Sequence, residues 1–142
     1  MRAALAVARR GLLAGEPPVG ACIVQDGRVI ASAHTAVAGG PDATAHAEIL
    51  AIRAACRSLR SATLTGCELY VSVEPCPMCL AACHYADIQQ IFFAASLQDM
   101  QAVTGHELFA SPPQSVQLHG AVLAEEARTM LAEWAAQRRE RV

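Results

Sequence analysis

Two short stretches near the middle of the chain restrict most strongly the folds that it can adopt. "ATAHAEIL" places His46 and Glu48 at the start of one predicted helix, and "EPCPMC" places Cys76 and Cys79 at the start of the next. Residues 49–74 lie between them, which is room for the rest of the first helix and one strand. Two consecutive helices that flank a parallel sheet begin at the same edge of it. The two stretches can therefore converge on one point in a fold that alternates strands and helices.

The segment before these stretches is predicted to form a helix and a β-hairpin. Residues 2–14 have helical spacing and stop at Gly15, a residue type that commonly follows a helix. Further along, two apolar runs flank Asp26-Gly27, which is the strongest short-range signal for a hairpin.

The helix that carries His46 is expected to follow a loop at residues 36–44. Either Asp42 or Thr44 can cap it, because both side chains accept hydrogen bonds from the first backbone N–H groups of a helix. Apolar residues then recur at the spacing of a buried helix face. That face is expected to consist of Ala45, Ile49, Ile52 and Cys56.

The rest of the chain continues the alternation of strands and helices. Residues 67–73 and 88–95 have the pattern of buried strands, and residues 77–86 that of a short helix with Pro77 in its first turn. This order predicts a mixed sheet with helices on both faces. The remaining expectations are a loop over most of 96–114, a last strand at 115–120 and an amphipathic helix at 122–139.

The composition fits a single globular domain over residues 1–142. Hydrophobic residues make up 54% and charged residues 17%, which indicates an apolar interior. The first apolar run is interrupted by Arg9 and Arg10, and no uncharged apolar run reaches the roughly 18 residues of a membrane span. The six cysteines fall largely in apolar periodic segments. We therefore expect a cytoplasmic protein with reduced thiols.

The charge of the chain does not require a nucleic-acid partner. The net charge is −2, and all eleven basic residues are Arg. One local cluster, Arg138, Arg139 and Arg141, could contact phosphates. The simpler interpretation is that these arginines are solvated at the C-terminal end of a helix, where positive charge interacts favourably with the helix macrodipole.

The Cys76–Cys79 pair has three interpretations when it is taken alone: a zinc half-site, a redox dithiol, or two core cysteines. Together with His46 it supplies three ligands, one short of the tetrahedron that zinc prefers. A fourth position open to water is typical of a catalytic site, and Glu48 could stand over that water. A redox protein would leave His46 and Glu48 unexplained. A structural zinc module would need a fourth ligand, for which Cys83 lies about one turn too far along its helix, so we expect Cys83 to pack in the core.

The H-x-E…P-C-x-x-C pattern resembles that of the cytidine deaminase-like superfamily, in particular its bacterial guanine deaminase and tRNA adenosine deaminase branch. The stretches that carry the resemblance are "PPVGACIVQDGRVIA", "DATAHAEILAIRAAC", "LYVSVEPCPMC" and "GAVLAEEA". The resemblance implies an α/β fold, a three-layer α/β/α sandwich with a mixed five-stranded sheet, and a homodimer. It also implies one Zn²⁺ per chain on His46, Cys76 and Cys79, with Glu48 as the catalytic acid and base that removes an exocyclic amine as ammonia.

The substrate is less closely specified by the resemblance. The family commonly places an Asn eleven residues before the zinc histidine, whereas this chain has Thr35 there, preceded by His34. The substrate-binding residues expected from the resemblance are His34, Thr35, Ala47 and the carboxylate of Glu107. "FFAASLQD" resembles guanine deaminases and "GAVLAEEA" resembles tRNA adenosine deaminases.

We expect a free aminated nucleobase or small aminoheterocycle, most of all a guanine-like one. The segment that follows the metal-site helix, "SLQDMQAVTG", has no Lys or Arg with which to hold tRNA, which leaves tRNA-specific adenosine deamination as the alternative. An inactive relative and a structural zinc module are further alternatives.

Overall fold

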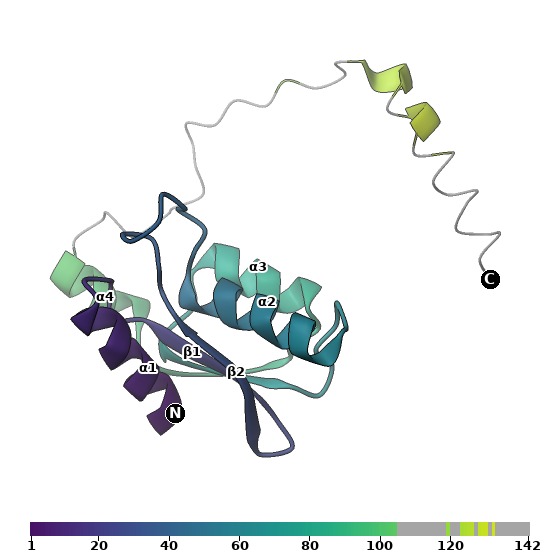
Figure 1. Cartoon of the computed structure of the whole chain (residues 1–142). Coiled ribbons are helices and arrows are strands. Elements are labelled where there is room, and N and C mark those ends of the chain that lie inside the picture. Colours follow the sequence, from purple (N-terminus) through teal and green to yellow (C-terminus); the bar gives the residue numbers. More distant parts are fainter. Residues whose placement is uncertain (105–118, 120–122, 127, 131, 133–142) are drawn as a thin grey trace. The chain divides into compact units, whose positions relative to one another are not determined.

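The computed structural model describes residues 1–104, 119, 123–126, 128–130 and 132, which are coloured in Figure 1. The chain divides into two compact units, Met1–Ala110 and Ser111–Val142. In the second unit, residues 124–126, 128–130 and 132 are helical, as predicted for the last helix. No helix among the described residues is long and apolar enough to cross a membrane.

The first unit contains a four-stranded mixed sheet. The strand order is β2-β1-β3-β4, with β1 antiparallel to both of its neighbours and β3 parallel to β4. Strands β2, β3 and β4 therefore run in the same direction. In chain order the elements are α1 (Arg2–Leu13), β1 (Gly20–Gln25), β2 (Arg28–His34), α2 (Ala47–Leu59), β3 (Glu68–Val73), α3 (Pro77–Tyr85), β4 (Gln90–Ala95) and α4 (Leu97–Thr104).

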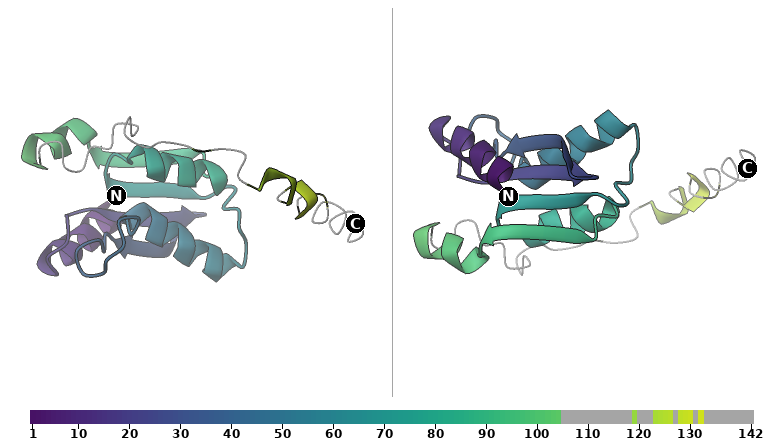
Figure 2. Two further views of the ribbon diagram at one scale, coloured as in Figure 1. Left: turned by 90° about the horizontal axis from the view of Figure 1, so that it is seen from above. Right: turned by 90° about the horizontal axis from the view of Figure 1, so that it is seen from below.

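Helices lie on both faces of this sheet. Because side chains alternate along a strand, Ala21 and Ile23 of β1 pack in the cluster that contains α2, whereas Cys22 packs with Ala4 and Val7 of α1. Figure 2 shows α2 and α3 in front of the sheet from one side and α1 in front of it from the other. Helix α1 approaches β1 closely, since a Cβ atom on Gly20 would lie 2.3 Å from the backbone nitrogen of Ala8.

The local predictions for the hairpin and the first helix are confirmed. Asp26 and Gly27 have φ angles of 49° and 74°, the left-handed values that a tight two-residue hairpin turn requires. Helix α1 ends at Leu13, and Gly15 has a φ angle of 84°. Pro77 is the first residue of α3, as expected.

The start of α2 differs from the prediction. The helix begins at Ala47, and His46 is its N-cap with no side-chain capping bond. Asp42 does not cap it and instead accepts hydrogen bonds from the backbone N–H and hydroxyl of Thr44. The expected apolar face is also shifted. The residues buried in the helix are Ala47, Glu48, Ala51, Ile52 and Ala55. Of the expected face, Ile52 and Ala45, the latter just before the helix, are buried, whereas Ile49 and Cys56 are half-buried.

One further expectation is wrong, and another falls on residues that the structure does not describe. Residues 96–114 are not mostly loop where they are described, because α4 occupies Leu97–Thr104. Ser96 and Asp99 form reciprocal hydrogen bonds at its start, which is the pattern of a capping box. The sheet has four strands within the described residues rather than five. The expected fifth strand at 115–120 lies outside the described residues except for His119, and so does most of the rest of the 96–114 segment.

Candidate metal centre

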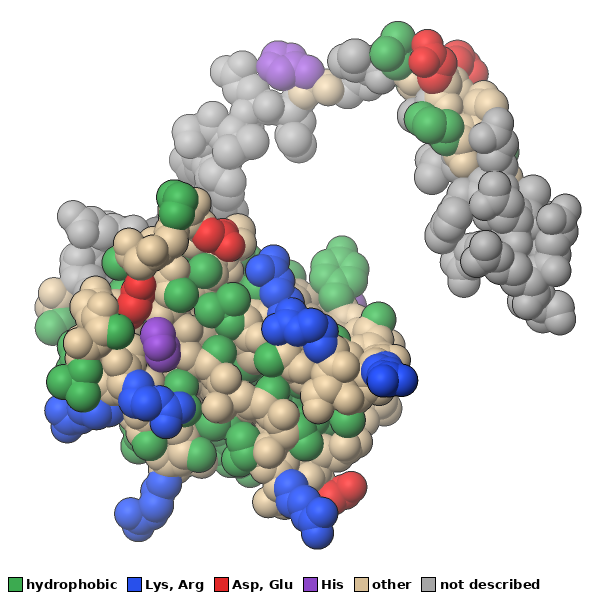
Figure 3. All heavy atoms as spheres, in the orientation of Figure 1, with side chains coloured by type: hydrophobic (Ala, Val, Ile, Leu, Met, Phe, Trp, Pro, Cys, Tyr) green, Lys and Arg blue, Asp and Glu red, His purple; other side chains and the backbone are tan. Residues whose placement is uncertain are grey.

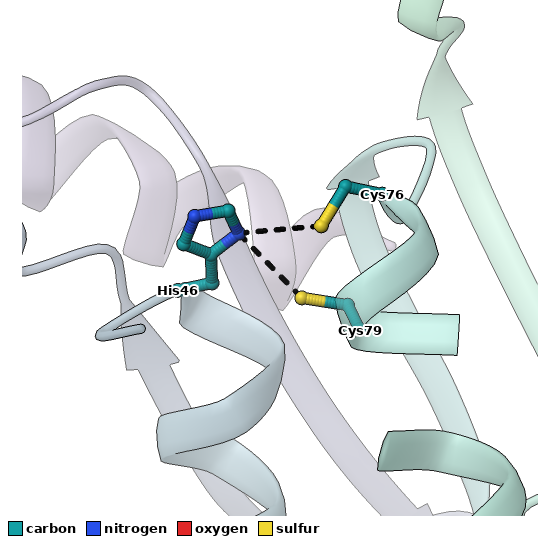
Figure 4. A group of neighbouring side chains, drawn as sticks. All are labelled: His46, Cys76 and Cys79. Carbon is teal, nitrogen blue, oxygen red and sulfur yellow. Dashed lines mark hydrogen bonds between the residues drawn. The ribbon is translucent and has the colours of Figure 1, made fainter. Parts of the chain in front are cut away.

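Three potential metal ligands converge at the starts of α2 and α3. Since β2 and β3 run in the same direction, the helices that follow them both begin at one edge of the sheet. His46 is the N-cap of α2, Cys76 is the N-cap of α3, and Cys79 lies in the first turn of α3. The Sγ atoms of both cysteines are 3.6 Å from Nδ1 of His46 (Figure 4).

This donor set fits a zinc ion. Tetrahedral zinc with bonds of about 2.0–2.1 Å to nitrogen and about 2.3 Å to sulfur separates such ligands by roughly 3.6 Å, which matches both measured distances. One ligand atom from each residue lies within 4.8 Å of the others, and no second group of three His, Cys, Asp or Glu residues does so in the described part of the chain. Three protein ligands leave one of the four tetrahedral positions without a protein ligand.

The electrostatics at the start of α3 favour a thiolate at Cys76. The neighbouring Cys79 thiol lowers the pKa of Cys76 to about 4, and the hydrogen bond with His46 acts in the same direction. The pKa of Cys79 is raised by the same pairing with Cys76, so the two sulfurs share a proton without a metal. The contact with Cys76 raises the pKa of His46. A cation bound here would displace the shared proton.

Glu48 lies beside these ligands in an unusual environment for a carboxylate. Its side chain is 3% exposed, and its Oε2 atom has no hydrogen-bond partner among the described residues. Burial raises the pKa of Glu48. A buried carboxylate with an unpartnered oxygen is costly unless it serves a ligand, so this atom fits a proton acceptor aimed at a bound molecule.

A small cavity of about 60 Å³ opens beside this cluster. Thr35 lines it with a side chain that is 4% exposed, and no described residue forms a hydrogen bond with its hydroxyl group. The cavity is thus an apolar slot with a few polar groups. Its lining residues are Pro17, Val19, Thr35, Val37, His46, Glu48, Val73, Glu74, Cys76, Leu97 and Met100.

The other predicted site residues lie elsewhere. His34 does not line the cavity: its ring lies against Gly11 of α1, and its Nδ1 lies 2.6 Å from the carbonyl oxygen of Thr35. Ala47 is fully buried in the core between α2 and the sheet. Glu107 lies outside the described residues. Cys83 is 1% exposed within the same core as Ala47, in agreement with the packing role expected for it.

Sequence reasoning missed the contribution of α4 to the cavity. Leu97 and Met100 of α4 line it, and the backbone N–H of Leu97 donates to Oε2 of Glu74 at 3.0 Å. Glu74 precedes the Pro75-Cys76 pair, so its carboxylate links α4 to the metal ligands. The Ser96-x-x-Asp99 spacing was a usable signal for this helix.

Comparison with known proteins agrees with this geometry. The sequence-family model of the cytidine and deoxycytidylate deaminase zinc-binding region matches residues 1–95. The chain belongs to this family of deaminases. Zinc is therefore the expected metal, and His46, Cys76 and Cys79 are the residues positioned to bind it.

Relatives within the deaminase family have different named activities. The tRNA-specific adenosine deaminase of Aquifex aeolicus is 48% identical over 95 residues, which cover 67% of this chain and 63% of that protein. The guanine deaminase of Bacillus subtilis is 45% identical over 100 residues, which cover 70% of this chain and 64% of that protein. The match thus spans just under two thirds of the length of each of these curated relatives.

The fold of the deaminase family is also seen in a solved structure. The X-ray structure of guanine deaminase from Bacillus subtilis matches with a TM-score of 0.80 at 35% identity, over 97% of this chain and 90% of that chain. The α/β fold with a mixed sheet that the resemblance implied is therefore confirmed, while the fifth strand is not seen in the described residues.

Proposed function

We propose that this chain is a zinc-dependent hydrolytic deaminase that removes an exocyclic amine from a free, guanine-like nucleobase or a small aminoheterocycle. The observation that carries the proposal is the buried Glu48 carboxylate, whose free oxygen adjoins three converging metal ligands on a small cavity. His46, Cys76 and Cys79 hold the zinc ion. A zinc ion in such a set supplies Lewis-acid activation of water near neutral pH.

Glu48 moves the protons of the reaction. Its raised pKa makes it a stronger proton acceptor than an exposed carboxylate. It takes the proton of the attacking water, transfers it to a ring nitrogen, and then helps to protonate the amine. A carbon–oxygen bond forms, the carbon–nitrogen bond breaks, and ammonia leaves.

The cavity supplies the recognition of the ring. Apolar side chains of Val37 and Leu97 can pack against a flat heterocycle, and the Thr35 hydroxyl is a donor or acceptor that has no partner in the described residues. The single hydroxyl of Thr35 can form hydrogen bonds with fewer polar groups of a base than a carboxamide can. We therefore expect several small aminated rings to be accepted.

The charge distribution favours a free base over tRNA. None of the residues that line the cavity is Lys or Arg, and α4 beside it carries Asp99 but no Arg. On the face in Figure 3 the basic side chains of the described residues are spread across the surface, a few of them adjacent, rather than gathered in one large patch. A polyanion is normally held by clustered cations, whose counterion release supplies much of the affinity.

Deamination of adenosine in tRNA is the second candidate. The higher identity to the tRNA-specific relative than to the guanine deaminase supports it. The Arg138, Arg139 and Arg141 cluster, outside the described residues, would then be the phosphate-binding segment.

Ammonia release from the zinc-loaded protein distinguishes the two. The substrates are guanine, cytosine, their nucleosides, small aminotriazines and an adenosine-bearing tRNA stem-loop, with Glu48→Ala as the control. We expect turnover of a free base and none by Glu48→Ala. Release from the stem-loop alone would replace the first candidate by the second, and release from no substrate would contradict both.

A further inference from the structure

One wall of the cavity is formed by the loop that joins β2 to α2. Thr35 and Val37, near its start, line the cavity. The base of the loop is fixed by backbone hydrogen bonds, from Thr35 N–H to the Val19 carbonyl (3.0 Å) and from Ala36 N–H to the Ala45 carbonyl (2.9 Å). Farther along, the loop's own hydrogen bonds are local, such as that from Asp42 N–H to the Gly40 carbonyl. The tip of the loop therefore needs another attachment.

Glu16 provides this attachment from the turn after α1. Its backbone N–H donates to the Gly11 carbonyl at 3.0 Å, which fixes it to the last turn of the helix. Its side chain is 6% exposed, with Oε2 accepting the N–H of Ala38 at 2.9 Å and Oε1 accepting the N–H of Gly39 at 2.6 Å. These hydrogen bonds, that from Ala38 foremost, lower the pKa of Glu16.

The hydrogen bonds from Ala38 and Gly39 to Glu16 form only when the loop lies in the observed conformation. Ala38 and Gly39 are exposed residues, so water could satisfy their N–H groups if the loop moved away. No salt bridge to Glu16 is formed by the described residues, so its charge is stabilised chiefly by the amides of this loop, with a smaller contribution from the nearby His34. A Cβ atom on Gly39 would lie 3.0 Å from Oε1, so a larger residue there would push the carboxylate by a few tenths of an ångström.

The contact also joins two parts of the cavity wall. Pro17, the residue after Glu16, lines the cavity, as does Val37, the residue before Ala38. We propose that Glu16 is a positioning residue, whose carboxylate fixes the Thr35–Val37 wall against Pro17 and so sets the width of the substrate slot. Its role in substrate binding rests on the proposed function, whereas its hold on the loop does not.

The first test compares Glu16→Gln with the unaltered full chain by amide hydrogen exchange. Gln keeps the size of the side chain but replaces one acceptor oxygen by an NH₂ group that cannot accept. Exchange of the Ala38 and Gly39 amides is expected to accelerate by at least roughly tenfold, confined to the loop. This measurement needs no substrate. Unchanged exchange at both amides would overturn the proposal.

The second test is kinetic and uses the free base that the zinc-loaded enzyme turns over. With the wall displaced, KM is expected to rise about tenfold while kcat stays within about twofold and zinc content is unchanged. A purely structural defect would instead lower zinc content and apparent kcat at constant KM. That result, or faster exchange with no change in KM, would contradict the positioning role. If the unaltered enzyme turns over nothing, the proposed function fails and the exchange result alone decides the loop contact.

Gly39→Ala tests the same contact from the other side without removing the carboxylate. Its Cβ atom must displace Oε1, so the same changes in exchange and KM are expected with smaller size. The double variant should be non-additive, because both changes break one contact. Additive effects would show that the two residues act separately. Glu68→Gln is the matched control, since its carboxylate bonds the Tyr70 hydroxyl on β3 and does not line the cavity.

Discussion

The floor and the rim of the cavity are held in place by different means. We call His46, Glu48 and Cys76, together with the buried ligand Cys79 beside them, the floor, and Thr35, Val37, Leu97 and Met100 the rim. The floor side chains stand at the starts of α2 and α3, whose positions follow from the direction of β2 and β3. The rim belongs to a loop whose tip is bound by the carboxylate of Glu16 and to α4, whose first residue donates to the carboxylate of Glu74.

This difference separates chemistry from substrate choice. A change in the floor should remove the metal or the proton carrier and so abolish turnover. A change in the rim should alter the affinity for the ring and leave the metal in place. Related enzymes could thus change substrate through the rim alone, which suits a family whose named members act on a free base and on tRNA.

The largest effect is expected from Cys79→Ala, which removes one floor ligand. Zinc content should fall from one ion per chain to nearly none, and activity should be lost with it, because three protein ligands are the minimum for a catalytic zinc site. Metal analysis after dialysis measures this. Cys83→Ala is the matched control. Because Cys83 packs in the core, this variant should keep its zinc ion. Loss of zinc from Cys83→Ala would instead indicate a closed structural site.

Glu48→Gln should separate proton transfer from metal binding. It keeps the shape of the side chain but cannot accept a proton, so kcat should fall by roughly a thousandfold. Zinc content should not change, since Glu48 is not among the three converging ligands. Steady-state kinetics beside metal analysis checks both. Turnover within about tenfold of the unaltered enzyme would remove Glu48 from the mechanism.

The same substitution should stabilise the metal-free protein in a pH-dependent way. Burial raises the pKa of Glu48, so folding favours its protonated form. That stability is fully present below the pKa of an unfolded Glu, about 4.3, and is lost as the pH rises through the higher folded value. Glu48→Gln should therefore have a higher Tm than the unaltered chain at pH 7 and an equal one near pH 4. An equal Tm at both pH values would contradict the buried, costly charge.

The floor could be predicted from the sequence, whereas of the rim only Thr35 was expected at the site. The floor depends on residue types at fixed spacing and on the rule that α2 and α3 begin at one edge. The rim depends on Glu16 reaching Ala38 and Glu74 reaching Leu97, side-chain contacts more than twenty residues apart that no local pattern encodes.

Local helix rules also misplaced the start of α2. His46 occupies an N-cap position where Asp42 or Thr44 was expected to act. Cys76 occupies the corresponding position of α3, although neither residue type is a preferred cap. Such departures are expected where function overrides local propensity.

Of the two substitutions that should affect the rim, Glu74→Ala is expected to have a larger effect on KM than Thr35→Val. It removes the acceptor for Leu97 N–H and loosens the start of α4, while the backbone bond from Glu74 N–H to the Ala95 carbonyl remains. KM should rise by about tenfold with zinc retained. Glu74→Gln keeps an acceptor oxygen and should restore most of the loss. A fall in zinc content in both variants would place Glu74 with the floor.

The smallest expected effect is that of Thr35→Val, which replaces a hydroxyl by a methyl group of similar size. If the hydroxyl bonds the substrate ring, KM should rise by roughly fivefold, the value of one uncharged hydrogen bond, with kcat and zinc content unchanged. Thr35→Ser keeps the hydroxyl and should have a KM close to that of the unaltered enzyme. Because no described residue bonds this hydroxyl, the substitution breaks no internal contact, and any change in KM can be assigned to the substrate. An unchanged KM in Thr35→Val would mean that the rim recognises its ring by shape alone.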